Sequence, residues 1–239
     1  MKIDQERCIG CGQCIPYCPV KAISMDADQA QIDFEECAEC GSCLRMAECP
    51  GDAIRQQEMQ WPRIIRSILS NPLTVAAESG IPGRGTEEMK TNEVTGRFKL
   101  GQVGIAIEVG RPVTGARLYD VEKVARAVAG LGVVFEKINP TTSLMSDPKT
   151  GKFKEDILNE KVLSAILEFS LKIDRLPELF PVLETVAGQI DSVFSLDVAT
   201  RIPPDGSVPT APYIAATGLW MAPNGKTNVG LGRPLIKED

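Results

Sequence analysis

Two cysteine-rich runs lie near the N-terminus of the chain. The first is Cys8-Ile9-Gly10-Cys11-Gly12-Gln13-Cys14-Ile15-Pro16-Tyr17-Cys18-Pro19. A related run follows as Cys37-Ala38-Glu39-Cys40-Gly41-Ser42-Cys43-Leu44-Arg45-Met46-Ala47-Glu48-Cys49-Pro50. Each run has three cysteines spaced C-x2-C-x2-C and ends in a fourth cysteine followed by proline. The two runs form an internal repeat that contains all eight cysteines of the 239-residue chain.

This spacing is typical of iron–sulfur ligation. Three closely spaced thiolates hold three corners of a [4Fe-4S] cube, and the fourth cysteine of the run points to the other cube. Cluster I is therefore predicted to use Cys8, Cys11, Cys14 and Cys49. Cluster II is predicted to use Cys37, Cys40, Cys43 and Cys18. Zinc needs only four ligands, and a disulfide framework needs an oxidising compartment, so both alternatives explain two interlocked sets less well.

Residues 1–57 resemble a bacterial-type ferredoxin with two [4Fe-4S] clusters. The resemblance implies a small electron-transfer domain whose clusters have no open iron for substrate. One departure is the gap between Cys43 and Cys49, which has five residues where the symmetrical pattern has three. In addition, Glu39 places a negative charge where the first run has Gly10. We therefore expect an enlarged loop near cluster II, and a cluster II that is harder to reduce than cluster I.

The charge of the chain is concentrated in the same region. Residues 1–59 carry five basic and eleven acidic side chains, a net charge of −6, which equals the net charge of the whole chain. Such an acidic module argues against nucleic acid and favours a basic docking patch on a larger redox enzyme or subunit. The absence of histidine excludes His-ligated haem, Rieske centres and Ser-His-Asp triads. No apolar run reaches the length of a membrane span, and the acidic start of the chain does not resemble a signal peptide, so we expect a cytoplasmic protein.

The sequence predicts an α+β chain in four parts. These are a two-[4Fe-4S] ferredoxin domain at 1–59, a helix and polar linker at 60–97, an α+β domain at 98–200 and a Pro/Gly-rich C-terminal arm at 201–239. Apolar periodicity predicts helices at 62–70, 118–131, 157–172 and 177–187, the last interrupted by Pro181. Strands are predicted at 98–109, 132–138, 141–145 and 193–200, with a turn at 147–151. The helix at 62–70 is expected to pack the first domain onto the next, in preference to docking a partner.

The order β-α-β-β-α-β indicates a sandwich with an antiparallel sheet and its helices on one face. It resembles small ligand-sensing regulatory domains of the ACT type. Two weaker patterns lie outside these elements. Residues 83–86 are a weak candidate for an anion cradle, with a linker or subunit contact as the default reading, and Asn224-Gly225 predicts a hairpin turn in the C-terminal arm.

These features favour an electron-transfer protein, or a subunit of an oxidoreductase, that passes low-potential electrons in anaerobic metabolism. The alternative is a redox- or metabolite-sensing regulator whose C-terminal domain binds a small molecule. An enzyme with its active site at 98–200 is a third interpretation, but no acid–base, nucleophile, flavin or nicotinamide motif supports it. We therefore assign no catalytic residue. Assembly with copies of the same chain or with other subunits is compatible with all three.

Overall fold

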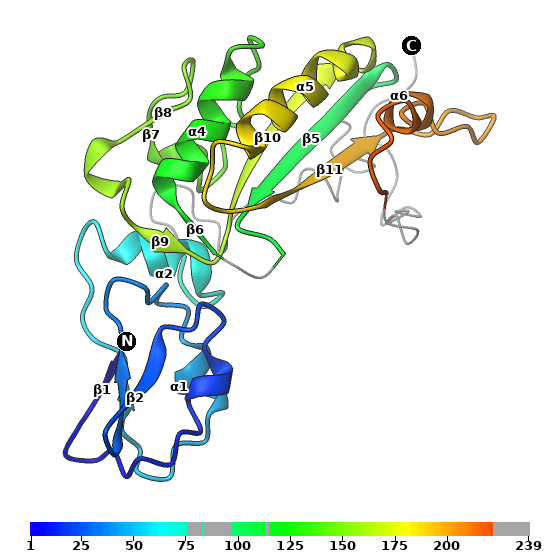
Figure 1. Cartoon of the computed structure of the whole chain (residues 1–239). Coiled ribbons are helices and arrows are strands. Elements are labelled where there is room, and N and C mark those ends of the chain that lie inside the picture. Colours follow the sequence, from blue (N-terminus) through cyan, green and yellow to red (C-terminus); the bar gives the residue numbers. More distant parts are fainter. Residues whose placement is uncertain (76–82, 84–96, 113–114, 222–239) are drawn as a thin grey trace.

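The computed structural model describes residues 1–75, 83, 97–112 and 115–221. Their apolar side chains gather in two clusters, one built from residues 1–54 and one from residues 65–186. We call residues 1–59 the N-terminal lobe, and residues 98–200 together with helix α2 (Ile64–Ser70) the C-terminal lobe. Figure 1 shows the two lobes end to end, with α2 between them. This mixture of helices and strands agrees with the predicted α+β class.

The N-terminal lobe contains two pairs of short antiparallel strands. Strand β2 (Ile23–Asp26) forms a hairpin with β3 (Gln29–Ile32). Strand β1 (Lys2–Ile3) pairs with β4 (Ile54–Arg55), and this pairing joins the two ends of the lobe. A 3-10 turn, η1 (Ile15–Tyr17), lies between Cys14 and Cys18 of the first cysteine run, and helix α1 (Ser42–Met46) lies in the second. The extra residues before Cys49 thus lengthen a helical turn.

Helix α2 belongs to the core of the C-terminal lobe. Ile65 and Leu69, one turn apart, are fully buried there. The Oγ of Ser70 accepts a hydrogen bond from the backbone N–H of Leu163 (2.9 Å). The expectation that this helix packs onto the next domain is therefore confirmed by its contacts, and its apolar face is not open to a partner.

The C-terminal lobe is built on a three-stranded antiparallel sheet. Strand β5 (Gln102–Val109) lies between β10 (Ala165–Lys172) and β11 (Phe194–Thr200), which run parallel to each other. The predicted strands at 98–109 and 193–200 are thus confirmed. Alternate residues of β5 and β10 point into one core, since side chains in a strand alternate between faces. These buried residues are Val103, Ile105, Ile107, Val109, Ala165, Leu167, Phe169 and Leu171.

Two helices cover this apolar face of the sheet. Helix α4 (Leu118–Ala129) contributes Val121, Val124 and Val128 to the same core, as the sequence predicts. Helix α5 (Leu176–Ala187) follows the 3-10 turn η4 (Ile173–Arg175) and packs against α4. Pro181 lies within α5 without dividing it. In the unit β10-α5-β11, strand β5 lies between the two parallel strands, so this part of the lobe is a split β-α-β arrangement.

The prediction of a long helix at 157–172 is wrong. This region holds the 3-10 turn η3 (Glu155–Ile157), strand β9 (Lys161–Val162), which pairs with β6 (Ala116–Arg117), and then the long strand β10. A helix was predicted because both faces of β10 are shielded from solvent: on its outer face Ile166 is half-buried and Glu168 is buried. Apolar residues on both faces of a strand can produce the 3.6-residue spacing that is typical of a helix.

The predicted strands at 132–138 and 141–145 are also corrected. Within the first, the structure has only an isolated bridge between Phe135 and Phe169 at the edge of β10. In the second, a 3-10 turn, η2 (Thr142–Leu144), leads into the hairpin of β7 (Met145–Asp147) and β8 (Lys152–Phe153). The described part of the sheet therefore has three strands instead of four. The predicted turn at 147–151 joins β7 to β8.

The chain continues past β11 to a short helix, α6 (Ala211–Ala215). The hairpin predicted at Asn224-Gly225 lies outside the described residues, as does most of the polar segment that contains the proposed anion cradle.

Candidate iron–sulfur site

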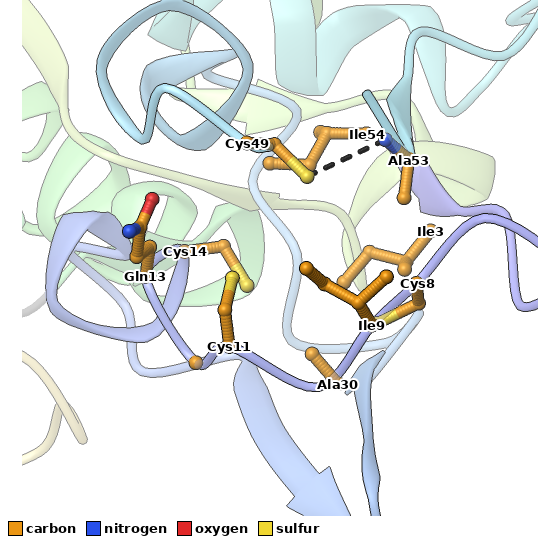
Figure 2. A pocket seen from close by; sticks show the side chains of 11 residues that line it. Ile3, Cys8, Ile9, Cys11, Gln13, Cys14, Ala30, Cys49, Ala53 and Ile54 are labelled. Carbon is orange, nitrogen blue, oxygen red and sulfur yellow. Dashed lines mark hydrogen bonds between the residues drawn. The ribbon is translucent and has the colours of Figure 1, made fainter. Parts of the chain in front are cut away.

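The cysteines of the first predicted set meet at one hollow in the N-terminal lobe. Cys8, Cys11, Cys14 and Cys49 all line it. Figure 2 shows Cys11, Cys14 and Cys49 arranged around the hollow, with Cys8 beside Ile9. The remaining wall is mostly apolar and is formed by Ile3, Ile9, Ala30, Ala53 and Ile54. The structure thus brings Cys49, from the end of the second run, to the three closely spaced cysteines of the first.

The second predicted set is more deeply buried. Burial, together with the nearby thiols of Cys40, Cys37 and Cys18, raises the pKa of the Cys43 thiol to about 12. Burial likewise raises the pKa of Cys14, and its neighbours Cys11, Cys49 and Cys8 add to the rise. Cys43 and Cys14 therefore each lie close to the three other members of their own predicted set. Buried thiols give up their protons only when positive charge compensates the thiolates, and iron supplies such charge.

The fourth cysteine of each run has the same local environment. The backbone N–H of Ala22 donates to Cys18 Sγ (3.1 Å), and that of Ala53 donates to Cys49 Sγ (3.4 Å). In both cases the donor lies four residues after the cysteine and beyond the Cys-Pro step. N–H donors to sulfur stabilise negative charge on a ligated thiolate and tune a cluster potential. The longer second run therefore keeps the sulfur environment of the first.

Matching positions in the two loops also share a backbone conformation. Gly10 and Glu39 both have left-handed φ angles, +70° and +53°. A Cβ at Gly10 would lie 2.0 Å from the carbonyl oxygen of Asp28, so the first loop needs glycine there. Glu39 accepts the strained conformation instead, which is uncommon for a residue with a side chain and concentrates at functional sites.

The charge of Glu39 is balanced within the structure. Its fully buried carboxylate accepts hydrogen bonds from Arg63 Nε (2.9 Å) and Nη2 (2.6 Å), and it also pairs with the Met1 ammonium. Burial alone would raise the pKa of Glu39, but these cations outweigh it and hold the pKa below its ordinary value. Because the carboxylate is compensated, the structure removes the reason for expecting cluster II to be harder to reduce.

Arg66 of α2 holds the backbone around Cys37. Its guanidinium is buried and its Nη1 donates to the carbonyl oxygens of Glu35 (2.8 Å), Cys37 (2.9 Å) and Phe34 (3.1 Å). Its Nε donates to the carboxylate of Glu160 in the C-terminal lobe. The side chain of Arg66 thus links residues 34–37, at the start of the second cysteine run, to the C-terminal lobe.

A second group of ion pairs lies at the same junction. Glu36 pairs with Arg117 (2.6 Å) and Lys161, whose hydrogen bonds and charges lower its pKa. The indole of Trp61 donates to the carboxylate of Asp156. The sequence does not reveal these contacts.

The donor set suits a cube of four irons. Among the described residues, no group of three or more His, Cys, Asp or Glu side chains is arranged around a single metal ion. A cube is larger than one ion, and it needs thiolates spread around a hollow with a mainly apolar wall, which is what the first set provides. The residues present therefore fit the cofactor that the cysteine spacing predicts.

The comparisons with known proteins point the same way. Residues 1–24 match the family model described as the 4Fe-4S binding domain. No curated protein and no solved structure matches the chain. Residues 1–24 are therefore similar to a 4Fe-4S binding domain, and this similarity supports, in general terms, an iron–sulfur electron-transfer role. Among the described residues, no helix is both long and apolar enough to span a membrane.

Proposed function

We propose that this chain binds two [4Fe-4S] clusters and passes single low-potential electrons to or from a partner oxidoreductase. The observation that carries the proposal is the grouping of the thiols into two sets of four, each completed by the last cysteine of the other run. Cluster I takes Cys8, Cys11, Cys14 and Cys49. Cluster II takes Cys37, Cys40, Cys43 and Cys18. With four thiolates each, the clusters supply one-electron chemistry and leave no iron for substrate.

The division of labour follows from the same grouping. The N-terminal lobe supplies every cysteine, and the C-terminal lobe supplies the contacts that hold it, through Arg66, Arg117 and Lys161. We assign the C-terminal lobe to recognition or assembly with a larger redox enzyme, of which this chain is a carrier or a subunit. The proposed setting is the cytoplasm of an organism with anaerobic metabolism, since reducing compartments keep thiols available for metal.

The test is metal content and spectroscopy of the anaerobically purified full chain. We expect about eight iron and about eight acid-labile sulfide per chain. The dithionite-reduced protein should give the broadened EPR signal of two interacting [4Fe-4S]⁺ centres. About four iron per chain, or zinc in place of iron, would refute the two-cluster proposal.

A further inference from the structure

The two cysteine loops are repeats in sequence but not in exposure. Ile9, between the first two cysteines of the first run, is 68% exposed, whereas Ala38 at the matching position of the second run is 1% exposed. Cys11 is exposed, and its counterpart Cys40 is buried. The internal repeat therefore provides its own comparison, because equivalent positions face solvent at cluster I and protein at cluster II.

Helix α2 and the segment after it account for this difference. Arg63 and Arg66, one turn apart, bind the carboxylate of Glu39 and the carbonyl oxygen of Cys37. At the other side of the loop, Arg45 joins the carbonyl oxygen of Cys40 (2.8 Å) to the side chain of Asn71 (3.1 Å). These polar contacts close the cluster II loop against the C-terminal lobe, so an external protein cannot approach cluster II from that side.

The surface at cluster I has a different character. Ile9 and Met25 are exposed apolar side chains close to Gly10, and the backbone oxygen of Asp28 lies against the same glycine. Asp28 is exposed, as are Glu6 and Glu48, which come shortly before Cys8 and Cys49 of the cluster I set in the sequence. The nearby cation Arg7 is paired with Asp52 (2.9 Å). A surface with an apolar centre and acidic residues at its edge is complementary to a partner surface with an apolar centre and basic residues at its edge.

From these observations, and resting on the proposed electron-transfer function, we propose that the redox partner docks over cluster I. The docking surface is formed by Ile9, Cys11 and Met25, and the partner is a redox protein with an apolar spot ringed by Lys and Arg. Cluster II exchanges electrons with that partner only through cluster I. Electron-transfer rates fall steeply with distance. A docked partner therefore exchanges electrons faster with cluster I, whose loop is exposed, than with cluster II, whose loop is buried.

The test uses hexaamminecobalt(III), a cation that takes one electron from the reduced protein and becomes cobalt(II). We compare Ile9→Lys with the matched control Leu73→Lys, which places the same charge at a 75% exposed apolar site two residues after Asn71, on the cluster II side. A 3+ ion and an added positive charge about 10 Å apart in water at about 0.01 M salt repel enough to slow reaction about four-fold. We expect this slowing for Ile9→Lys and no change for Leu73→Lys. Equal slowing of both variants, or slowing of the control alone, would overturn the assignment.

A second measurement needs no variant. Redox-inert hexaamminechromium(III), added to the wild-type protein, should broaden the hyperfine-shifted NMR signals of the cluster I cysteines and spare those of cluster II. Equal broadening of both sets would also overturn the assignment. Iron content is measured on every sample first. A chain with fewer than two clusters would refute the proposed function itself, whereas symmetrical access with both clusters in place would refute only the docking proposal.

Discussion

Replacing Arg66 by methionine tests whether α2 secures cluster II. The substitution keeps an unbranched apolar stem but removes the guanidinium and with it every donor. Three carbonyl oxygens, of Phe34, Glu35 and Cys37, then lose a hydrogen bond, and Glu160 loses its cation. Removing one partner of a buried ion pair costs about 3–5 kcal/mol. The side chain of Glu160 is 12% exposed, so water partly replaces the cation, and we expect the lower end, about 3 kcal/mol.

That free energy sets the size of the effect on cluster retention. If iron leaves cluster II through local opening of the loop, about 3 kcal/mol speeds its release on the order of 100-fold. The assay is anaerobic transfer of iron to excess chelator, followed by absorbance, with EPR to identify the cluster that remains. We expect the half of the iron that belongs to cluster II to leave much faster in Arg66→Met, and the other half to leave at the wild-type rate. Arg66→Lys should recover only part of the loss, because a single ammonium cannot reach all the acceptors of the guanidinium.

The matched control is Arg55→Met on the cluster I side. Arg55 pairs with Asp52 (2.7 Å), but both side chains are substantially exposed, and solvent screening leaves such pairs little effect on stability. Iron release from either cluster should therefore change little in this variant. Unchanged iron release in Arg66→Met, or equal acceleration at both clusters, would show that α2 does not secure cluster II.

Three further changes address the cysteine loops and the docking surface. Cys18→Ala should destabilise cluster II and leave cluster I closer to intact by EPR, although Cys18 lies in the first run; selective loss of cluster I would contradict the crossed ligation. The second-order rate with a basic redox protein should fall as salt rises above about 0.1 M, where charges are screened over about 10 Å. A rate independent of salt would mean that docking is apolar. Gly10→Ala should cost at least about 2 kcal/mol, since its Cβ would meet the Asp28 carbonyl oxygen at 2.0 Å in a left-handed conformation. Gly12→Ala is the control, because Gly12 has a similar φ but a Cβ there would be 3.8 Å from its nearest neighbour, Ile15 Cδ1. Only about 1 kcal/mol of backbone strain is expected for this variant. Equal stability losses of the two variants in chelator or thermal assays would contradict the steric argument.

The meeting of Cys49 with Cys8, Cys11 and Cys14 at one hollow agrees with the expectation from local cysteine spacing, whereas the ligation itself stays a prediction. The steps Cys8-Cys11-Cys14 and Cys37-Cys40-Cys43 fix which thiols share a loop, and the fourth cysteine of each run must reach elsewhere. The supporting contacts were not predictable. Arg66 binds backbone carbonyls, which carry no side-chain signal, and a carboxylate 94 residues further along the chain. Nothing in the local pattern distinguishes this arginine from one that faces solvent.

The sheet illustrates a different limit. Strand β5 and helix α4 were predicted because each has one apolar face and one more polar face, which fixes the period. In β10, the buried residues Ala165, Leu167 and Phe169 follow the strand period, yet Leu158, Val162 and Ile166 complete a helical stripe. Pairing within the sheet selects the strand over the helix, because Leu167 and Phe169 pair in register with Ile107 and Ile105 of β5. That pairing joins residues about 60 positions apart and cannot be read from a local window.

The contact between Arg66 and Glu160 has a consequence for biosynthesis. The cysteines are complete once residue 49 has been made, and the ends of the N-terminal lobe can close when β4 follows, so cofactor insertion can precede most of translation. The carboxylate that anchors Arg66 arrives more than 100 residues later. During that interval the loop before Cys37 lacks its anchor, and assembly factors have access to cluster II that they lose when the second core folds. If the proposed cluster II is present, we expect it to be inserted before the C-terminal lobe folds, and a chain truncated before Glu160 to lack the contact between Arg66 and Glu160.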